Sequence, residues 1–387
     1  MPIRVNPELI DDLNPFGAED VQLCYHCGDC SAVCPHSDET YRFPRKSTRY
    51  LQMGLGRKLE TTLEPWLCYY CGQCSEQCPR QADPGETMMS IRRWLISRYD
   101  FTRIARQFFR SRKTEILAII LIALLTGIAV LYYNSIRGSI YVYDGEDAFL
   151  PSSLVHRFDL ILGSFLGLML AIGAIRMWYL TMSGKRGVHI PWWLYVKNFH
   201  LLPLHFFTQK RYAACESKKN NKLFMPWFVH LGLMLGYVTM LLIVMAFLPA
   251  LQSGPEILWT VHVFGYLATA GLLIGTVFFI YSRYKKNQIQ YKKSHGTDWV
   301  FVILLFLIAL TGIIQHLFHR AGLIVPANVT YLIHLMLVVP WLFRMPFSKW
   351  AHLVYRPLAM YFADVRKEAL ALQEKKTESI PEAQYAF

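Results

Sequence analysis

The residues best suited to chemistry are eight cysteines in two blocks of one spacing, C-x2-C-x2-C-x3-C-P, which end at Pro35 and Pro79. In this spacing three thiolates converge on one [4Fe–4S] cubane, and the fourth points to a neighbouring cluster. Each block therefore supplies its last cysteine to the cluster of the other. The pattern predicts one cluster on Cys24, Cys27, Cys30 and Cys78, and a second on Cys68, Cys71, Cys74 and Cys34.

Zinc sites and disulfides are the alternatives for so many cysteines. Zinc takes four ligands, commonly in two pairs, whereas two identical quartets match two cubanes. Disulfides are disfavoured in a cytoplasmic domain, and the opening residues hold no apolar secretory signal. The ninth cysteine, Cys215, stands alone in the sequence, and we interpret it as a bystander.

The rest of the chain has the composition of a membrane protein. Of its 387 residues 53% are hydrophobic and only 17% are charged, too few for an ordinary soluble surface, and the 14% aromatic content excludes disorder. A helix of about 18 apolar residues or more crosses roughly 30 Å of hydrocarbon. Six runs reach that length: 116–133, 154–180, 226–248, 257–281, 299–318 and 329–347.

The sequence thus predicts an all-α protein with two unlike halves. The segment between the quartets has a helical rather than a strand-like pattern, which indicates an α-helical ferredoxin domain. The predicted order is this ferredoxin domain at 1–100, a basic linker at 101–115, a six-helix transmembrane cytochrome b domain at 116–356, and a cytoplasmic helix and tail at 357–387.

Lysine and arginine alternate along the chain in step with the predicted spans. They crowd before the first span and in the second and fourth connecting loops, while the other loops hold almost none. Basic residues mark cytoplasmic loops, so we expect both termini and the ferredoxin domain in the cytoplasm. This placement explains the net charge of +13 through contact with anionic lipid and argues against a nucleic-acid partner. Residues 184–225 mix aromatics with lysines, as an interfacial amphipathic segment does.

Histidines in or beside the predicted spans are candidate haem ligands. Eighteen residues, about five helical turns, separate His334 from His352, so on one helix they would share a face at a separation of roughly 27 Å. Such a pair can ligate haems near opposite faces of a membrane. Pro340 lies between the two histidines and makes this register approximate.

The cysteine-bearing segment resembles a known family. PRK at 44–46, QMGL at 52–55, WLC at 66–68 and SEQCPR at 75–80 resemble the C subunit of heterodisulfide reductases, over roughly residues 15–95. That resemblance implies an α-helical ferredoxin with two [4Fe–4S] clusters. Two clusters of this kind conduct electrons and do not by themselves form a catalytic site.

Two of the predicted spans resemble helices of di-haem cytochromes. Residues 226–241 and 333–357 are similar to helices of the nitrate reductase gamma subunit family, which also resembles the E subunit of heterodisulfide reductase. The resemblance implies two haem b groups. It places His230 and His352 on the cytoplasmic-side haem and His334 on the outer haem.

The second ligand of the outer haem is open. Met240 stands where the cytochrome family has its second outer histidine. His262 is the preferred substitute, followed by His156. A thioether bond from Met240 and a five-coordinate iron in the outer haem are further alternatives.

The second predicted span begins with charged residues, His156, Arg157 and Asp159. Charge within an apolar span is costly and tends to mark a proton or ligand path. We therefore expect a quinone headgroup or proton-exit site beside the outer haem. The alternative is a local pair of Arg157 with Asp159 at the membrane interface.

Over its whole length the chain resembles the C subunits of quinone-interacting membrane-bound oxidoreductase complexes of sulfate-reducing bacteria. That resemblance implies a bacterial cytoplasmic membrane, menaquinone as the quinone, and soluble flavin- and iron–sulfur-bearing partners similar to the A subunit of heterodisulfide reductase. It also implies electron exchange with adenylylsulfate reductase in sulfate respiration. The chain holds no dinucleotide fingerprint, P-loop or nucleophile with a base, so no catalytic residue is expected.

Three alternatives to this function remain open from the sequence. The first is a heterodisulfide-reductase-like complex with another soluble partner. The second is a free-standing membrane oxidoreductase with its own soluble donor. The third is a haem-free membrane anchor that carries a ferredoxin domain.

Overall fold

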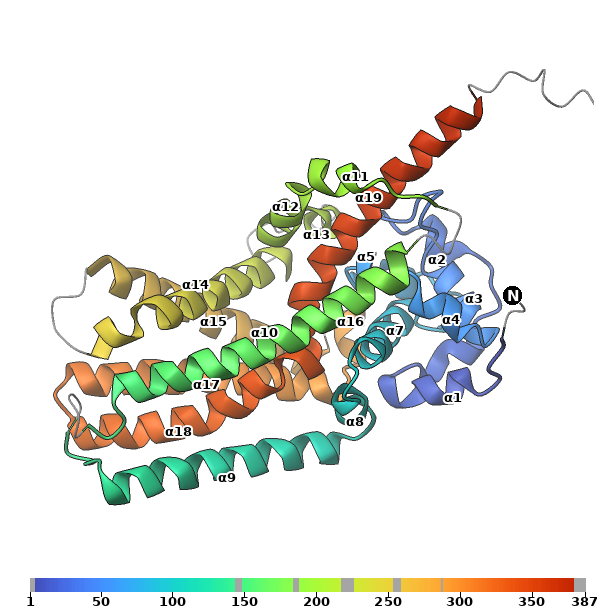
Figure 1. Cartoon of the computed structure of the whole chain (residues 1–387). Helices are drawn as coiled ribbons and strands as arrows, with labels where there is room; N and C mark the ends of the chain where they lie inside the picture. Colours follow the sequence, from blue (N-terminus) through green and yellow to red (C-terminus); the bar gives the residue numbers. More distant parts are fainter. Residues whose placement is uncertain are drawn as a thin grey trace, which may run out of the picture. The chain divides into compact units, whose positions relative to one another are not determined.

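The computed structural model describes residues 4–142, 148–183, 188–216, 226–252, 259–286 and 288–378. Every regular element within these ranges is helical (Figure 1), which confirms the all-α fold predicted from the sequence. The chain divides into two compact units. One comprises Met1–Tyr99, Ile172–Cys215 and His352–Phe387, and the other Asp100–Ala171 and Glu216–Ala351. The predicted tail beyond residue 378 and parts of the predicted interfacial segment, 184–187 and 217–225, lie outside the described residues.

Short helices build the N-terminal part of the first unit. Glycines and prolines between them break the chain often, so only the last helix is long. The helices of this part are α1 (Leu9–Leu13), the 3-10 helices η1 (Asn14–Phe16) and η2 (Glu19–Leu23), α2 (Asp29–Ala32), α3 (Arg45–Gln52), α4 (Gly56–Glu60), α5 (Glu64–Leu67), α6 (Gln73–Glu76) and α7 (Pro84–Tyr99).

The C-terminal helix belongs to the core of this first unit. Helix α19 (His352–Glu378) packs against α5, α11 (Trp192–Lys197) and α12 (Leu201–Thr208), and α13 (Lys210–Glu216) follows α12. The Tyr355 ring lies 5.7 Å from that of Trp66 and 5.3 Å from that of Tyr99, and all three side chains are fully buried. Three buried aromatic rings in mutual contact hold α19 to the cysteine-bearing part.

Six helices of the described chain are long and apolar enough to cross a membrane, as the sequence predicted. These helices are α9 (Arg112–Ile136), α10 (Ser152–Met182), α14 (Pro226–Gln252), α15 (Trp259–Lys285), α17 (Gly296–Arg320) and α18 (Ile324–Phe343). Within the second unit α14 packs on α15, α15 on α17, α17 on α18, and α18 on α9 (Figure 1). Two short helices complete this unit, α8 (Ile104–Arg110) and α16 (Ile289–Lys292).

Small residues bring α14 and α15 close together. A Cβ atom on Gly236 would lie 2.6 Å from the carbonyl oxygen of Ala268, and one on Gly271 would lie 2.9 Å from that of Gly232. Close approach through small residues is how helices associate in a membrane, where there is no hydrophobic force between them.

The last span begins and ends earlier than predicted, and the expectation that His334 and His352 share one helix is wrong. Helix α18 ends at Phe343, two 3-10 helices follow, η4 (Met345–Phe347) and η5 (Lys349–Ala351), and α19 begins at His352. The buried Arg344 side chain pairs with Glu115 at this break, and Pro346 lacks the N–H that a continuing helix needs.

Alanine at Gly236 should destabilise the protein, because overpacking of this kind costs about 1–3 kcal/mol. Gly265 on α15 is the matched control, since a Cβ there would meet nothing within 4 Å. Alanine is a better helix former than glycine, so Gly265→Ala should stabilise by up to about 1 kcal/mol. Thermal unfolding in detergent measures both changes. A Gly236→Ala protein as stable as the parent would contradict this packing.

Candidate functional site

Each cysteine quartet folds as a loop followed by one turn of helix. Gly28 and Gly72 precede α2 and α6 with φ angles of 104° and 87°, a left-handed conformation that glycine adopts without strain. The third cysteine of each quartet, Cys30 or Cys74, lies on the helical turn that follows. Because α2 packs on α6, the two quartets face one another, as shared ligation requires.

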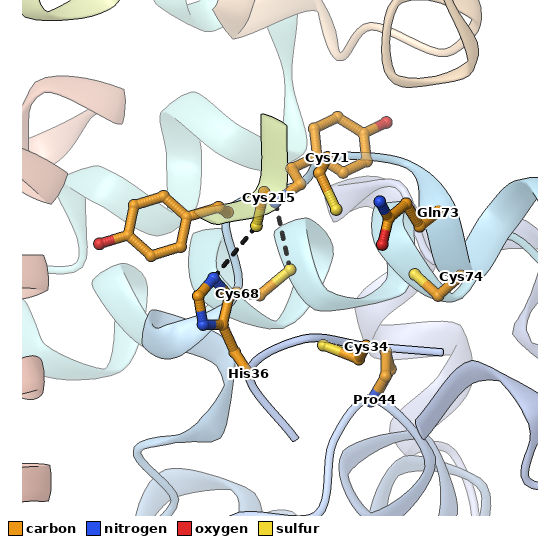
Figure 2. A pocket seen from close by; sticks show the side chains of 10 residues that line it. Cys34, His36, Pro44, Cys68, Cys71, Gln73, Cys74 and Cys215 are labelled. Atoms are coloured by element: carbon orange, nitrogen blue, oxygen red, sulfur yellow. Dashed lines mark hydrogen bonds between the residues drawn. The ribbon is translucent and has the colours of Figure 1, made fainter. Parts of the chain in front are cut away.

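Four thiols line a single cavity in the first unit (Figure 2). They come from three cysteines of the second quartet and the last cysteine of the first: Cys68, Cys71, Cys74 and Cys34. Burial, together with the neighbouring thiols of Cys68 and Cys71, raises the pKa of Cys34 to about 12. Four buried thiols around one cavity suit iron, which binds cysteine as the thiolate and would supply the positive charge that such thiolates need.

The other three cysteines of the first predicted set lie near Cys30. Burial raises the pKa of its thiol to about 11, and the nearby thiols of Cys24, Cys27 and Cys78 act in the same direction. The structure thus brings together both sets named by the sequence analysis. In the described part of the chain no three His, Cys, Asp or Glu side chains converge on one metal ion. Thiols spaced around a cavity suit a cubane, which needs a larger space than a single ion.

Two guanidinium groups contact the second quartet. Arg92 and Arg356 both donate hydrogen bonds to the main-chain carbonyl oxygen of Cys68, at 2.8 Å from Arg356 Nη2. Arg92 Nε also donates to the carbonyl of Pro65 at 2.6 Å. Burial lowers the pKa of Arg92 to about 9, so it stays charged at neutral pH. No ion pair among the described residues includes either arginine, and an anionic cluster would supply the missing negative charge.

An aromatic side chain joins the two helices that cover this cavity. The Arg356 guanidinium lies over the Tyr69 ring at 3.6 Å, and the ring of Tyr212 on α13 stacks with Tyr69 at 5.3 Å. Tyr69 Oη donates to the sulfur of Met360 on α19 at 3.0 Å. Helices α13 and α19 therefore hold the second quartet, although they lie far from it in the sequence.

The two quartets differ in how they use equivalent serines. Ser31 accepts from the Arg45 amide at 3.2 Å, and as a hydrogen-bond partner it lowers the pKa of the neighbouring Cys30 thiol. Ser75 instead donates to Asp83 Oδ1 at 2.6 Å and accepts from the Gly85 amide at 3.1 Å. Ser31 therefore interacts with the cysteine beside it, whereas Ser75 holds the first residues of α7 in place.

Cys215, interpreted from the sequence as a bystander, lines the same cavity as the second quartet (Figure 2). His36 Nε2 lies 3.1 Å from its sulfur. Burial lowers the pKa of His36 to about 4, and Arg211 and Arg356 add to the effect. No sequence signal links Cys215 to the quartets, because it lies outside their motif and on another helix.

His334 on α18 contacts the neighbouring helix α17, and its role as a haem ligand stays a prediction. Its Nδ1 lies 2.9 Å from Thr311 Oγ1, and that hydroxyl donates to the Leu307 carbonyl at 2.7 Å. Where that hydroxyl accepts from His334, the ring proton is on Nδ1 and Nε2 is the nitrogen that could bind a metal. A Cβ on Gly312 would lie 3.1 Å from His334 Cε1, so this glycine gives the ring its room.

The structure places His262, the preferred substitute ligand, beside His316. Their ring centroids are 5.6 Å apart, and Tyr266 Oη lies 2.9 Å from His316 Nε2. His316 is four residues beyond Gly312 on α17, about 6 Å along the helix axis. His262 thus lies about one turn from the level of His334, and their joint ligation of one haem stays a prediction.

The predicted inner-haem ligands lie on different helices and in different units. His230 is on α14, with its ring centroid 6.2 Å from that of Phe279. His352 is the first residue of α19 in the first unit. Their pairing on one haem stays a prediction.

The predicted quinone residues lie in the first two turns of α10. Arg157 Nε donates to the carbonyl of Ser153 at 3.1 Å. No ion pair between Arg157 and Asp159 occurs among the described residues. His156 is the residue that lies near Asp159, so the structure does not favour the local Arg157–Asp159 pair.

Comparison with known proteins identifies the cysteine-bearing segment. The 4Fe–4S dicluster domain family matches residues 20–82. No curated protein and no solved structure matches the chain. The chain thus carries an N-terminal 4Fe–4S dicluster domain together with six membrane-competent helices. That combination is a multi-pass membrane redox subunit with an electron-transfer role.

Serine substitutions should reveal which cluster each quartet's last cysteine serves. Serine is a poorer iron ligand, so Cys34→Ser should alter the EPR signal that Cys68→Ser alters, and Cys78→Ser the signal that Cys24→Ser alters. Non-haem iron should fall below the expected value of about eight per chain in each variant. If Cys34→Ser and Cys24→Ser changed the same signal, each quartet would hold its own cluster and the crosswise assignment would be wrong.

Proposed function

We propose that the chain is the membrane subunit of a quinone-linked redox complex. It passes electrons between menaquinone and cytoplasmic flavin- and iron–sulfur-bearing subunits, through haem b and two [4Fe–4S] clusters. Quinol gives up two electrons, whereas haem and clusters each carry one, so the chain divides the pair into single steps. The dicluster domain and the six membrane-competent helices support this proposal.

The observation that carries the proposal is the start of α19. His352, the proposed ligand of the cytoplasmic-side haem, is its first residue, and Arg356 follows one helical turn later, about 6 Å along the axis. Arg356 donates to the carbonyl of Cys68, a proposed ligand of the second cluster. A haem held by His352 would therefore lie close to that cluster. Electrons would leave the haem for the second cluster and reach the first cluster last.

The first cluster suits exchange with a soluble partner. Cys27 is exposed, and the neighbouring Tyr25 is 60% exposed. In contrast Cys68 and Cys74 of the second cluster's site are buried. We assign the partner, by resemblance, to proteins similar to the A subunit of heterodisulfide reductase, with adenylylsulfate reductase as the terminal acceptor or donor.

Haem b and non-haem iron per chain, measured on the purified membrane protein, test this function. Two haems with about eight non-haem irons, and haem reduction by a menaquinol analogue, are expected. One haem would mean that the loss of the family's histidine at Met240 removed the outer site. Absence of haem would leave a cluster protein on a membrane anchor and contradict the proposal.

Substitution of His352 should remove one haem without affecting the clusters. His352→Ala should lower haem b by one per chain and leave non-haem iron at about eight. His200→Ala is the control, because His200 is exposed and its Nδ1 lies 3.0 Å from the Lys197 carbonyl, away from any proposed ligand. Unchanged haem content and spectrum in His352→Ala would exclude it as a ligand.

Substitution of Asp159 should weaken quinone binding, because Asp159 is part of the proposed headgroup site. Asp159→Asn keeps the size of the side chain and removes its charge. Because a hydrogen bond to a charged group contributes about 1.5–3 kcal/mol, quinone-analogue affinity and quinol turnover should fall about tenfold or more. If both stayed at the level of the parent protein, the quinone would bind elsewhere.

A further inference from the structure

The ninth cysteine lies at the second cluster's site. Cys215, near the end of α13, is 6% exposed, and its side chain points into the cavity that the second quartet lines (Figure 2). It comes from a helix 179 residues beyond His36 in the sequence, and His36 in turn follows Cys34 by two residues. Five thiols thus meet at one cavity, although a cubane takes four.

Two contacts fix the Cys215 sulfur. Cys71 lines the same cavity as Cys215 and, as a hydrogen-bond partner, raises the pKa of the Cys215 thiol. His36 Nε2 lies 3.1 Å from the Cys215 sulfur. A thiol has one proton. If that proton is directed to Cys71, the imidazole N–H of His36 must donate to the Cys215 sulfur, and the three groups form one chain of hydrogen bonds.

We propose that Cys215 is a positioning residue of the second cluster, whose S–H donates a hydrogen bond to the ligating sulfur of Cys71 while His36 holds the Cys215 sulfur. Hydrogen bonds to cluster sulfurs are among the factors that set the reduction potential. A donor to a thiolate withdraws negative charge and favours the reduced, more negative cluster. Cys215 therefore raises the reduction potential of the second cluster and leaves the first unchanged.

Two other roles for Cys215 agree less well with its surroundings. A buried free cysteine commonly behaves as a small hydrophobe, but the neighbours of this one are an imidazole and a thiol. As a fifth ligand it would have to displace one of the four thiols that the spacing assigns. The proposal rests on the second cluster alone and holds whether or not the chain carries haem or uses quinone.

The test compares three substitutions in the full-length chain in detergent, with about eight non-haem irons as the loading check. Cys215→Ala removes the donor and leaves a void. Cys215→Val removes the donor and fills most of the volume, and Cys215→Ser restores a donor. Ser31→Ala is the matched control, because Ser31 hydrogen-bonds Cys30 at the first cluster's site. Dithionite and mediators reduce the clusters during an EPR-monitored titration, so no quinone or haem is involved.

The expected result is a shift of one midpoint potential to more negative values in both Cys215→Ala and Cys215→Val. Cys215→Ser should return it toward the parent value. Ser31→Ala should shift the other potential. Unchanged potentials in the Ala and Val variants would overturn the proposal. A shifted midpoint potential in Cys215→Ala alone would also overturn it, because that result would indicate a void rather than a lost donor. The same holds if the Cys215 variants shifted the potential of the cluster that Ser31→Ala affects.

Discussion

The interaction on which the ferredoxin half depends is the pair of guanidinium groups on the Cys68 carbonyl. Arg92 and Arg356 bring two positive charges to one point from α7 and α19, and burial of such charges is costly without an opposite charge. A [4Fe–4S] cluster with four thiolates is anionic and provides that charge. A bound cluster would therefore stabilise this site, and the two cations would in turn favour the cluster's reduced, more negative state.

The same contact explains why the C-terminal helix belongs to the N-terminal unit. Tyr355 packs in the core beside Trp66, and Arg356, the next residue, reaches the cysteine loop. His352 precedes both on the same helix. One helix therefore links the proposed haem ligand to the better shielded of the two clusters, while the exposed Cys27 marks the opposite end of the path.

Local patterns in the sequence were sufficient to predict the quartets and the six spans. A fixed spacing of cysteines and a run of apolar residues are read from adjacent positions, and both are present in the structure. The roles of Arg356 and Cys215 were not predictable in this way, because each acts through a tertiary contact with a distant loop. The break after Phe343 was missed because the Arg344–Glu115 pair forms only in the folded chain.

Rapid freezing of the oxidised protein after mixing with a menaquinol analogue tests the proposed order of electron transfer most directly. Haem b should be reduced first, the cluster whose EPR signal responds to Cys68→Ser second, and the cluster that responds to Cys24→Ser last. Reduction of the first cluster ahead of the second, or of both clusters while haem b stayed oxidised, would contradict the path through α19.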